Sequence, residues 1–251
     1  MTRANVAGLL LVAWMWFPSA SWAESLEELT QRATQGDVKA QTTLGTKYAE
    51  GINTPVDYHQ ALKWFKSAAE HGNAVAEYNL GLMYIHGEGV PLNLKEAKKW
   101  FLKSAERGDT EAQFVLGLMY ADGDGVPRHY HEAHKWFRLA AEHGHPSAQL
   151  NLGLMYLRGE GVKKQPDEAV KWFRMSAEQG NPHAQYELGL CYALGDGISA
   201  DKPEAYFWFA LAAAERQAYA HLELDKLEQE LSPAQITAAQ KRAAEWQPVL
   251  Q

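Results

Sequence analysis

AEYNLGLMYIHGEGVPLNLKEAKKWFLKSAERG, residues 76–108, sets the architecture of the whole chain. Its first half places Ala76, Leu80, Met83 and Tyr84 at helical spacing, which predicts a helix with one apolar face. The segment 87–91, Gly-Glu-Gly-Val-Pro, ends that helix, because glycine allows positive φ and proline cannot continue a helix. The second half places alanines and a Trp-Phe pair on one face of another helix. The stretch therefore predicts a helical hairpin.

The same pattern returns every 36 residues without an insertion. Recurring positions include Leu44, Leu80, Leu116, Leu152, Leu188 and Leu224, the glycines Gly51, Gly87, Gly123, Gly159 and Gly195, and the pairs Trp64-Phe65, Trp100-Phe101, Trp136-Phe137, Trp172-Phe173 and Trp208-Phe209. A single hairpin cannot bury both of its faces, whereas stacked hairpins can. We therefore predict an all-α fold, a right-handed α-solenoid superhelix of helix-turn-helix repeats. We expect small residues such as Gly81 to let paired helices approach closely, and the Trp-Phe pairs to fill the space between neighbouring units.

The predicted organisation has five repeats between two capping segments. Its boundaries are 1–23 for a signal peptide, 24–36 for an N-terminal capping helix, 37–72, 73–108, 109–144, 145–180 and 181–216 for the repeats, and 217–251 for C-terminal capping helices. Ser25 with Glu28 forms a capping box before the first helix. Ser232 followed by Pro233 opens a last helix that departs from the repeat.

The first residues are typical of a secretory leader. Arg3 precedes an apolar run over 6–17, and Ser21-Trp22-Ala23 is a small-x-small cleavage site. The run is short for a membrane-spanning helix, which needs about 17–25 residues. We expect cleavage after Ala23 and a periplasmic or secreted protein, with membrane contact only through an uncleaved leader.

Composition narrows the function further. The chain has 251 residues and a net charge of −7, whereas nucleic-acid binding normally shows as a basic excess, so no nucleic-acid partner is expected. The single cysteine, Cys191, allows no internal disulfide and occupies the position of Met83, which favours a buried thiol.

The repeated residues resemble the Sel-one-like repeat family, relatives of the tetratricopeptide repeats. Its pattern A-x-x-x-L-G-x-x-Y-x-x-G-x-G-V, then A-x-x-W-F, fits residues 36 to 216. Repeat one departs at Asn53 and Thr54, where others have Gly-Val, and repeat five departs at Arg216, where others have Gly. The resemblance implies a protein-binding adaptor in envelope signalling or host contact, or an immunity protein that neutralises a toxin. A cysteine-rich branch is linked to β-lactam binding or hydrolysis, but this chain lacks those cysteines.

The sequence contains only incomplete motifs for metal binding or catalysis. Asp122-Gly123-Asp124 resembles the start of a calcium loop, but Val126 stands where a third oxygen ligand is needed. Histidines that could share zinc are His129, His131 and His134, with His143, His145 and His71 in turns. No unit supplies four ligands, and nucleophile, phosphate-loop and dinucleotide motifs are absent. We therefore expect no enzyme, no catalytic residue, no metal and no cofactor; a cell-wall or β-lactam hydrolase is the least favoured alternative.

A lysine ladder recurs on the second helices, at Lys63, Lys99, Lys135 and Lys171. It could attract an acidic partner. Glu96, Glu132 and Glu168 lie three residues before the last three lysines, so local ion pairs on a solvated face explain it better.

The candidate partner-binding surface is the concave side of the solenoid, which the first helices normally line. The variable positions form a stripe: Asn79, Leu82, His86, Val115, Leu118, Asp122, Asn151, Leu154, Arg158, Glu187, Leu190 and Leu194. A leucine column flanked by polar residues suits a protein or peptide partner. Alternatively, these leucines are core. We expect a monomer, because both ends are capped.

Overall fold

The computed structural model describes residues 25–249, and the predicted leader lies outside them. The described residues form thirteen α-helices and no strand. Their bounds are α1 Leu26–Thr34, α2 Val38–Glu50, α3 Tyr58–Glu70, α4 Ala74–His86, α5 Leu94–Glu106, α6 Thr110–Asp122, α7 Tyr130–Glu142, α8 Pro146–Arg158, α9 Pro166–Glu178, α10 Pro182–Leu194, α11 Lys202–Ala214, α12 Ala220–Glu228 and α13 Pro233–Glu245. The prediction of an all-α solenoid is confirmed.

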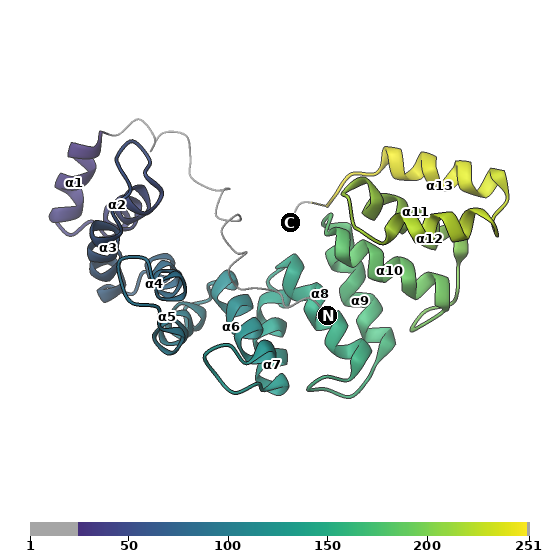
Figure 1. The fold of residues 1–251 in the computed structure, drawn as a ribbon, viewed down its shortest axis with the longest axis horizontal. Coiled ribbons are helices and arrows are strands. Elements are labelled where there is room, and N and C mark those ends of the chain that lie inside the picture. Colours follow the sequence, from purple (N-terminus) through teal and green to yellow (C-terminus); the bar gives the residue numbers. More distant parts are fainter. Residues whose placement is uncertain (1–24, 250–251) are drawn as a thin grey trace. The chain divides into compact units, whose positions relative to one another are not determined.

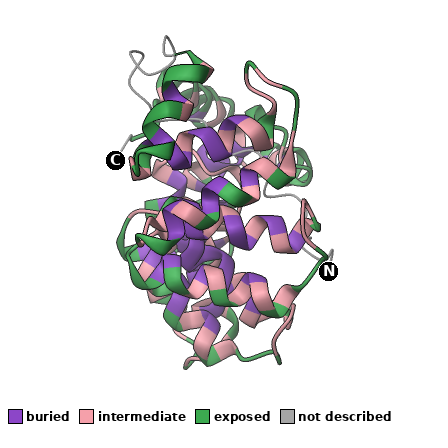
Figure 2. Ribbon diagram, turned by 90° about the vertical axis from the view of Figure 1, so that its left-hand side faces the viewer, coloured by how far each residue is buried: buried purple, intermediate pink, exposed green. Residues whose placement is uncertain are grey.

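The chain divides into two compact units after His129, inside the third repeat. The first contains α1 to α6, in which α1, α3 and α5 form one row and α2, α4 and α6 form another (Figure 1). The second contains α7 to α13. Buried and exposed residues alternate along the second helices of the repeats, whereas the first helices are mostly buried or half-buried, as the purple and pink segments of Figure 2 illustrate. Helices of one unit therefore bury their apolar faces against one another.

Glycine lets the two helices of a repeat touch. A Cβ atom at Gly81 of α4 would lie 2.5 Å from Phe101 Cε1 of α5, and one at Gly189 of α10 would lie 2.6 Å from Phe209 of α11. Neither phenylalanine has any exposed surface. The prediction of close approach at Gly81 is confirmed, and the reason is that phenylalanine occupies the space of the missing side chain.

The two residues of each Trp-Phe pair pack in different places. Phe101 fills its own hairpin, so the prediction that the whole pair lies between units is wrong for phenylalanine. Trp64 packs in a cluster with Leu29 and Ala33 of the preceding helix α1, as predicted for a contact between neighbours. Adjacent positions on a helix point about 100° apart, which separates the two contacts.

Left-handed residues close the turns. Gly87 ends α4 with φ 73°, and Gly89 packs against the preceding repeat, where a Cβ would lie 2.7 Å from the Tyr58 carbonyl oxygen. The two departures from the glycine pattern keep this backbone, since Asn53 has φ 58° and Arg216 has φ 60°. Arginine in this conformation is strained by about 1–2 kcal/mol, so Arg216 is a weak point of repeat five.

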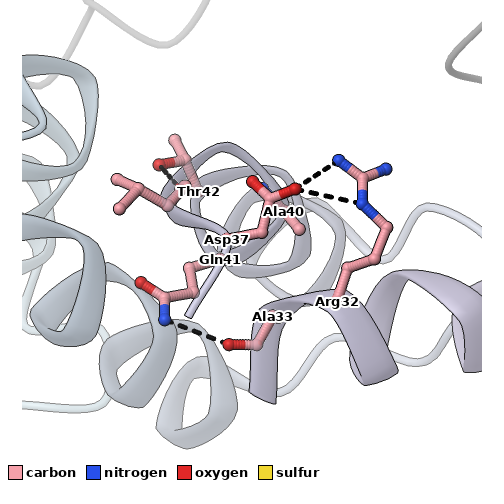
Figure 3. Close-up of polar contacts among 7 residues, drawn as sticks. Arg32, Ala33, Asp37, Ala40, Gln41 and Thr42 are labelled. Atoms are coloured by element: carbon pink, nitrogen blue, oxygen red, sulfur yellow. Dashed lines mark hydrogen bonds and ion pairs between the residues drawn. The ribbon is translucent and has the colours of Figure 1, made fainter. Parts of the chain in front are cut away.

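In four of the five repeats, a buried glutamine joins the first helix to the helix before it. Gln41 donates from Nε2 to the Ala33 carbonyl, while Arg32 pairs with Asp37 at the adjoining turn (Figure 3). The same bond recurs in three further repeats, where Gln113 donates to Ala105, Gln149 to Ala141 and Gln185 to Ala177. These bonds satisfy carbonyl groups at helix C-termini.

Repeat two breaks this rule with a charged residue. Glu77 has 1% exposed surface and accepts from Arg107 Nε at 3.0 Å. A carboxylate has no proton to give a carbonyl, so it needs this cationic partner instead. Repeat four has a neutral version of the contact, since Gln179 Nε2 donates to Gln149 Oε1 at 2.8 Å.

Both ends carry the predicted caps. Ser25 and Glu28 form a capping box on α1, and Ser232 and Gln235 form one on α13. α13 folds back onto α11, where Arg242 pairs with Glu204 at 2.8 Å and lies 4.3 Å above the Phe207 ring. Beyond α13, Val249 N–H donates to the Glu178 carbonyl of α9. The C-terminal segment thus seals the last repeat.

Candidate protein-binding surface

The same leucine recurs on four first helices, Leu82 and Leu118 in the first unit and Leu154 and Leu190 in the second, and we call these four residues the leucine column. Each is half-buried, whereas Leu80 and Met83 beside Leu82 are fully buried. Leu154 and Leu190 pack against the core of the second unit with one side. The column is thus neither pure core nor free surface: each leucine supports its unit and keeps an exposed edge.

Polar groups flank the column on both sides. Asn79 and Asn151 are half-buried and donate from Nδ2 to carbonyls one turn earlier, Val75 at 2.7 Å and Ser147 at 2.8 Å. Each bond uses one of the two amide N–H groups on the parent helix, so the side-chain oxygen and the second N–H are left to pair with a partner. A surface of this kind, apolar along the middle and polar at the rim, is typical of protein interfaces.

Charge varies along the column. Burial raises the pKa of Asp122 and Asp124 adds to the effect, whereas Arg128 opposes it. Burial also raises the pKa of half-buried Glu187, and Arg158 opposes the change. The first unit therefore carries an acid at the C-terminal end of α6, and in the second unit exposed Arg158 is near enough to Glu187 to influence its charge. Leu194 continues the second unit's surface with 76% exposure.

Two residues of the predicted partner-binding stripe, Val115 and His86, offer little exposed surface to a partner. Val115 has no exposed surface, so it offers nothing to a partner. His86 is half-buried, and its Nε2 atom is buried without a hydrogen-bond partner. The residues equivalent to Val115 are half-buried and those equivalent to His86 are exposed. The repeat fixes the register of a residue but not how deeply its side chain is covered.

Four of the six candidate histidines make hydrogen bonds that stabilise the fold. His71 and His143 pair through Nδ1 with carbonyls one turn earlier in their own helices, and His145 Nδ1 accepts from Ala148 N–H as the N-cap of α8. His134 Nε2 lies 3.3 Å from Tyr156 Oη. Within residues 25–249, no three His, Cys, Asp or Glu side chains gather as a metal site would need.

Cys191 is buried with 3% exposed surface. Burial raises the pKa of its thiol to about 12, and Glu187 and Asp196 add to the shift. A thiol with a raised pKa is protonated at neutral pH and is a poor nucleophile. The prediction of an inert buried thiol fits this environment.

The lysine ladder is largely paired, as its spacing predicts. Lys99 Nζ lies 2.5 Å from Glu96, Lys171 lies 2.5 Å from Glu168, and Lys135 lies 4.0 Å from Glu132. Lys63 has no such acid and lies over the Trp64 ring at 4.9 Å.

Two features escaped the sequence reasoning although both carry a signal. The buried glutamines recur at the 36-residue step, with Glu77 as the exception. The ladder position continues into repeat five as Phe207, which indicates that something covers this face of α11. α13 is that cover.

Among the described residues, no helix is both long and apolar enough to span a bilayer. The helices of the repeats are all 13 residues long, or about 20 Å, which suits stacking in a solenoid.

A family model for the Sel1 repeat matches five consecutive windows, residues 38–73, 74–109, 110–145, 146–181 and 182–216. A crystal structure of c5321, a protective antigen of uropathogenic Escherichia coli with an SLR fold, is 37% identical, with a TM-score of 0.81 over 88% of this chain and 49% of that one. A Sel1 repeat protein from Oxalobacter formigenes is 34% identical, with a TM-score of 0.74 over 87% and 90%.

A curated relative is the secretory immunoglobulin A-binding protein EsiB of Escherichia coli. It is 46% identical over 44 residues, which are 18% of this chain and 9% of that protein. The chain therefore spans only a small part of this relative's length.

Proposed function

Because the chain belongs to the Sel1 repeat family, we propose that it is an exported scaffold that binds a protein or peptide along the leucine column. Sel1 repeat proteins are generally non-enzymatic scaffolds that bind protein partners. The observation that carries this particular surface is the half-burial of the same leucine in four repeats, next to positions that are fully buried.

The physical argument rests on what each leucine offers. An exposed leucine edge gains free energy when a partner covers it, at about 25 cal/mol per Å² of apolar area. The flanking amides and charges then select the partner, because a polar rim left unpaired on binding is costly. We base the proposal of export on the leader-like residues 1–23, and envelope signalling or host contact is the setting we propose for the scaffold.

The test is capture of partners from the native host with a matched control. The full gene with a C-terminal tag is expressed, cross-linked briefly and purified, alongside Leu118→Gln/Leu154→Gln. The control is Met175→Gln/Leu222→Gln, two exposed apolar residues outside the column and its polar rim. We expect one partner with the wild type and the control, and its loss in the column variant.

Folding must be checked in the same proteins. If the column variant loses its thermal transition by circular dichroism, the leucines are core and the proposed surface is wrong. Recovery of the same partner by a folded column variant would also reject the surface.

A second candidate function is binding of a host immunoglobulin, favoured by the similarity to EsiB. Purified secretory immunoglobulin A is the direct probe, and surface plasmon resonance with the wild type and both variants measures it. Binding that the column variant loses would support host contact. A toxin recovered in the capture experiment would instead support an immunity protein.

A further inference from the structure

The second helices of the first unit carry an excess of positive charge. α3 and α5 together contain six lysines and three glutamates, in a chain whose net charge is −7. Five lysines are exposed and form what we call the basic ridge: Lys63, Lys66, Lys95, Lys99 and Lys103. The corresponding helix of the second unit, α9, has two basic and three acidic residues.

Most of the ridge is unneutralised. Lys99 is paired with Glu96, but the other four lysines have no carboxylate within ion-pair distance among the described residues. Lys103 Nζ lies 4.0 Å above the Trp100 ring, which orients the ammonium group without cancelling its charge. By contrast, the exposed Arg138 of α7 is paired with Glu142 at 2.7 Å.

The two helices of the ridge belong to one packed cluster. Trp100 of α5 packs against the cluster that contains Ala61 and Phe65 of α3 and Leu80 of α4. At their C-terminal ends, the Arg107 guanidinium lies against Gly72, where a Cβ would be 2.7 Å away. Lysines from both helices are therefore placed to contact one partner.

Exposed apolar side chains precede both helices. Val56 lies before α3 with 52% exposure, and Leu92 lies before α5 with 64% exposure, at equivalent positions of successive repeats. Repeats three and four have Arg128 and Lys164 there. The first unit thus combines lysines with apolar residues that have no core to fill.

We propose that the basic ridge docks on an anionic lipid surface, with Val56 and Leu92 inserting among the headgroups. Lysine is a compact point charge suited to diffuse phosphate groups, whereas recognition of defined carboxylates favours the arginine fork, and α3 and α5 contain no arginine. Apolar residues beside lysines are the composition of interfacial segments. This proposal does not depend on the leucine column.

The experiment measures vesicle co-sedimentation of the protein spanning residues 24–251, which contains every described helix and omits the apolar run near the N-terminus. The ridge variant is Lys63→Glu/Lys95→Glu/Lys103→Glu. The control, Lys163→Glu/Lys164→Glu/Lys241→Glu, changes exposed lysines of the second unit and alters net charge equally. Vesicles rich in phosphatidylglycerol are compared with pure phosphatidylcholine.

We expect the wild type to bind only the anionic vesicles and to dissociate as salt is raised. Each lysine near an anionic surface contributes about fivefold, so the ridge variant should bind at least about 100-fold more weakly. The control should lose less than about fivefold. Leu92→Gln should weaken binding by a factor that does not change with salt.

Three results would overturn the proposal. The first is a wild type that does not bind anionic vesicles at low salt, and the second is a control that loses as much as the ridge variant. The third is an acidic protein that needs the ridge for capture while vesicles do not bind, which would make the ridge a protein-docking surface.

Discussion

α5 in the first unit and α11 in the second hold the same place in their repeats but present opposite surfaces. α5 leaves Lys99 exposed beside Lys95 and Lys103. α11 replaces the ladder lysine with Phe207, which has 5% exposed surface and lies beneath Arg242. The hairpin interior is the same in both, with Phe101 and Phe209 against glycine. The face of the second helix that points away from its hairpin partner can therefore differ between repeats: it is a charged surface in α5, and in α11 it is covered by α13.

The largest expected effect comes from exchanging these two residues. Phe207→Lys should lower the free energy of unfolding by about 3 kcal/mol, because a buried ring is lost and an ammonium is placed beside Arg242. Lys99→Phe should change stability by less than about 0.5 kcal/mol, because that side chain is exposed. Urea unfolding followed by circular dichroism measures both. Equal effects would show that α13 does not seal α11.

The next largest effect should come from breaking the charged contact between Arg107 and Glu77, which has a neutral counterpart in repeat four. Arg107→Ala should cost about 1–2 kcal/mol, less than for a fully buried pair because the arginine side chain is half exposed while Glu77 stays buried. In a Glu77→Gln background the same change should cost little, since glutamine can donate to the preceding helix as it does in the other repeats.

A double-mutant cycle by urea unfolding measures that coupling. The reference in the second unit is Gln179→Ala, which removes a neutral hydrogen bond to Gln149 and should cost less than about 1 kcal/mol. A coupling of zero between Arg107 and Glu77 would mean that solvent, not Arg107, stabilises the carboxylate.

A smaller effect should appear at the turn where repeat five departs from the pattern. Arg216→Gly should stabilise the protein by about 1 kcal/mol, because glycine adopts φ 60° without strain. Gly180→Ala, the equivalent turn of repeat four with φ 89°, should destabilise it by a similar amount. Differential scanning calorimetry should give shifts of opposite sign, and a lower melting temperature for Arg216→Gly would contradict the strain argument.

The smallest effect is a pH dependence confined to the second unit. Burial lowers the pKa of His134 below its ordinary value of 6.5, and Arg138 and His131 lower it further. The unfolded chain therefore binds a proton at a higher pH than the folded protein does. The stability that His134 contributes is complete above pH 6.5 and is lost as pH falls through the lowered folded-state pKa.

Lys98 is the counterpart in the first unit, with its ammonium 5.1 Å from the Tyr120 ring. His134→Gln should reduce the loss of melting temperature between pH 7.5 and 5.5, whereas Lys98→Gln should leave it unchanged. If both variants keep the full pH dependence, another group is responsible.

Most of the architecture follows from local pattern. The 36-residue register predicts the hairpins, the turns at Gly87 and its equivalents, and the caps at Ser25 and Ser232, because each depends on residues within a few positions of one another. The pairing of the lysine ladder with glutamates three residues earlier could be predicted for the same reason.

Features that depend on contacts between residues far apart in the sequence could not be predicted from local pattern. The complete burial of Val115, the exposed edge of Leu118 and the pairing of Glu77 with Arg107, 30 residues later, depend on helices that meet only when the chain stacks. The same holds for α13, whose Arg242 reaches Glu204 across 38 residues. Periodicity fixes which face a residue occupies, whereas burial depends on the atoms that another helix brings to that face.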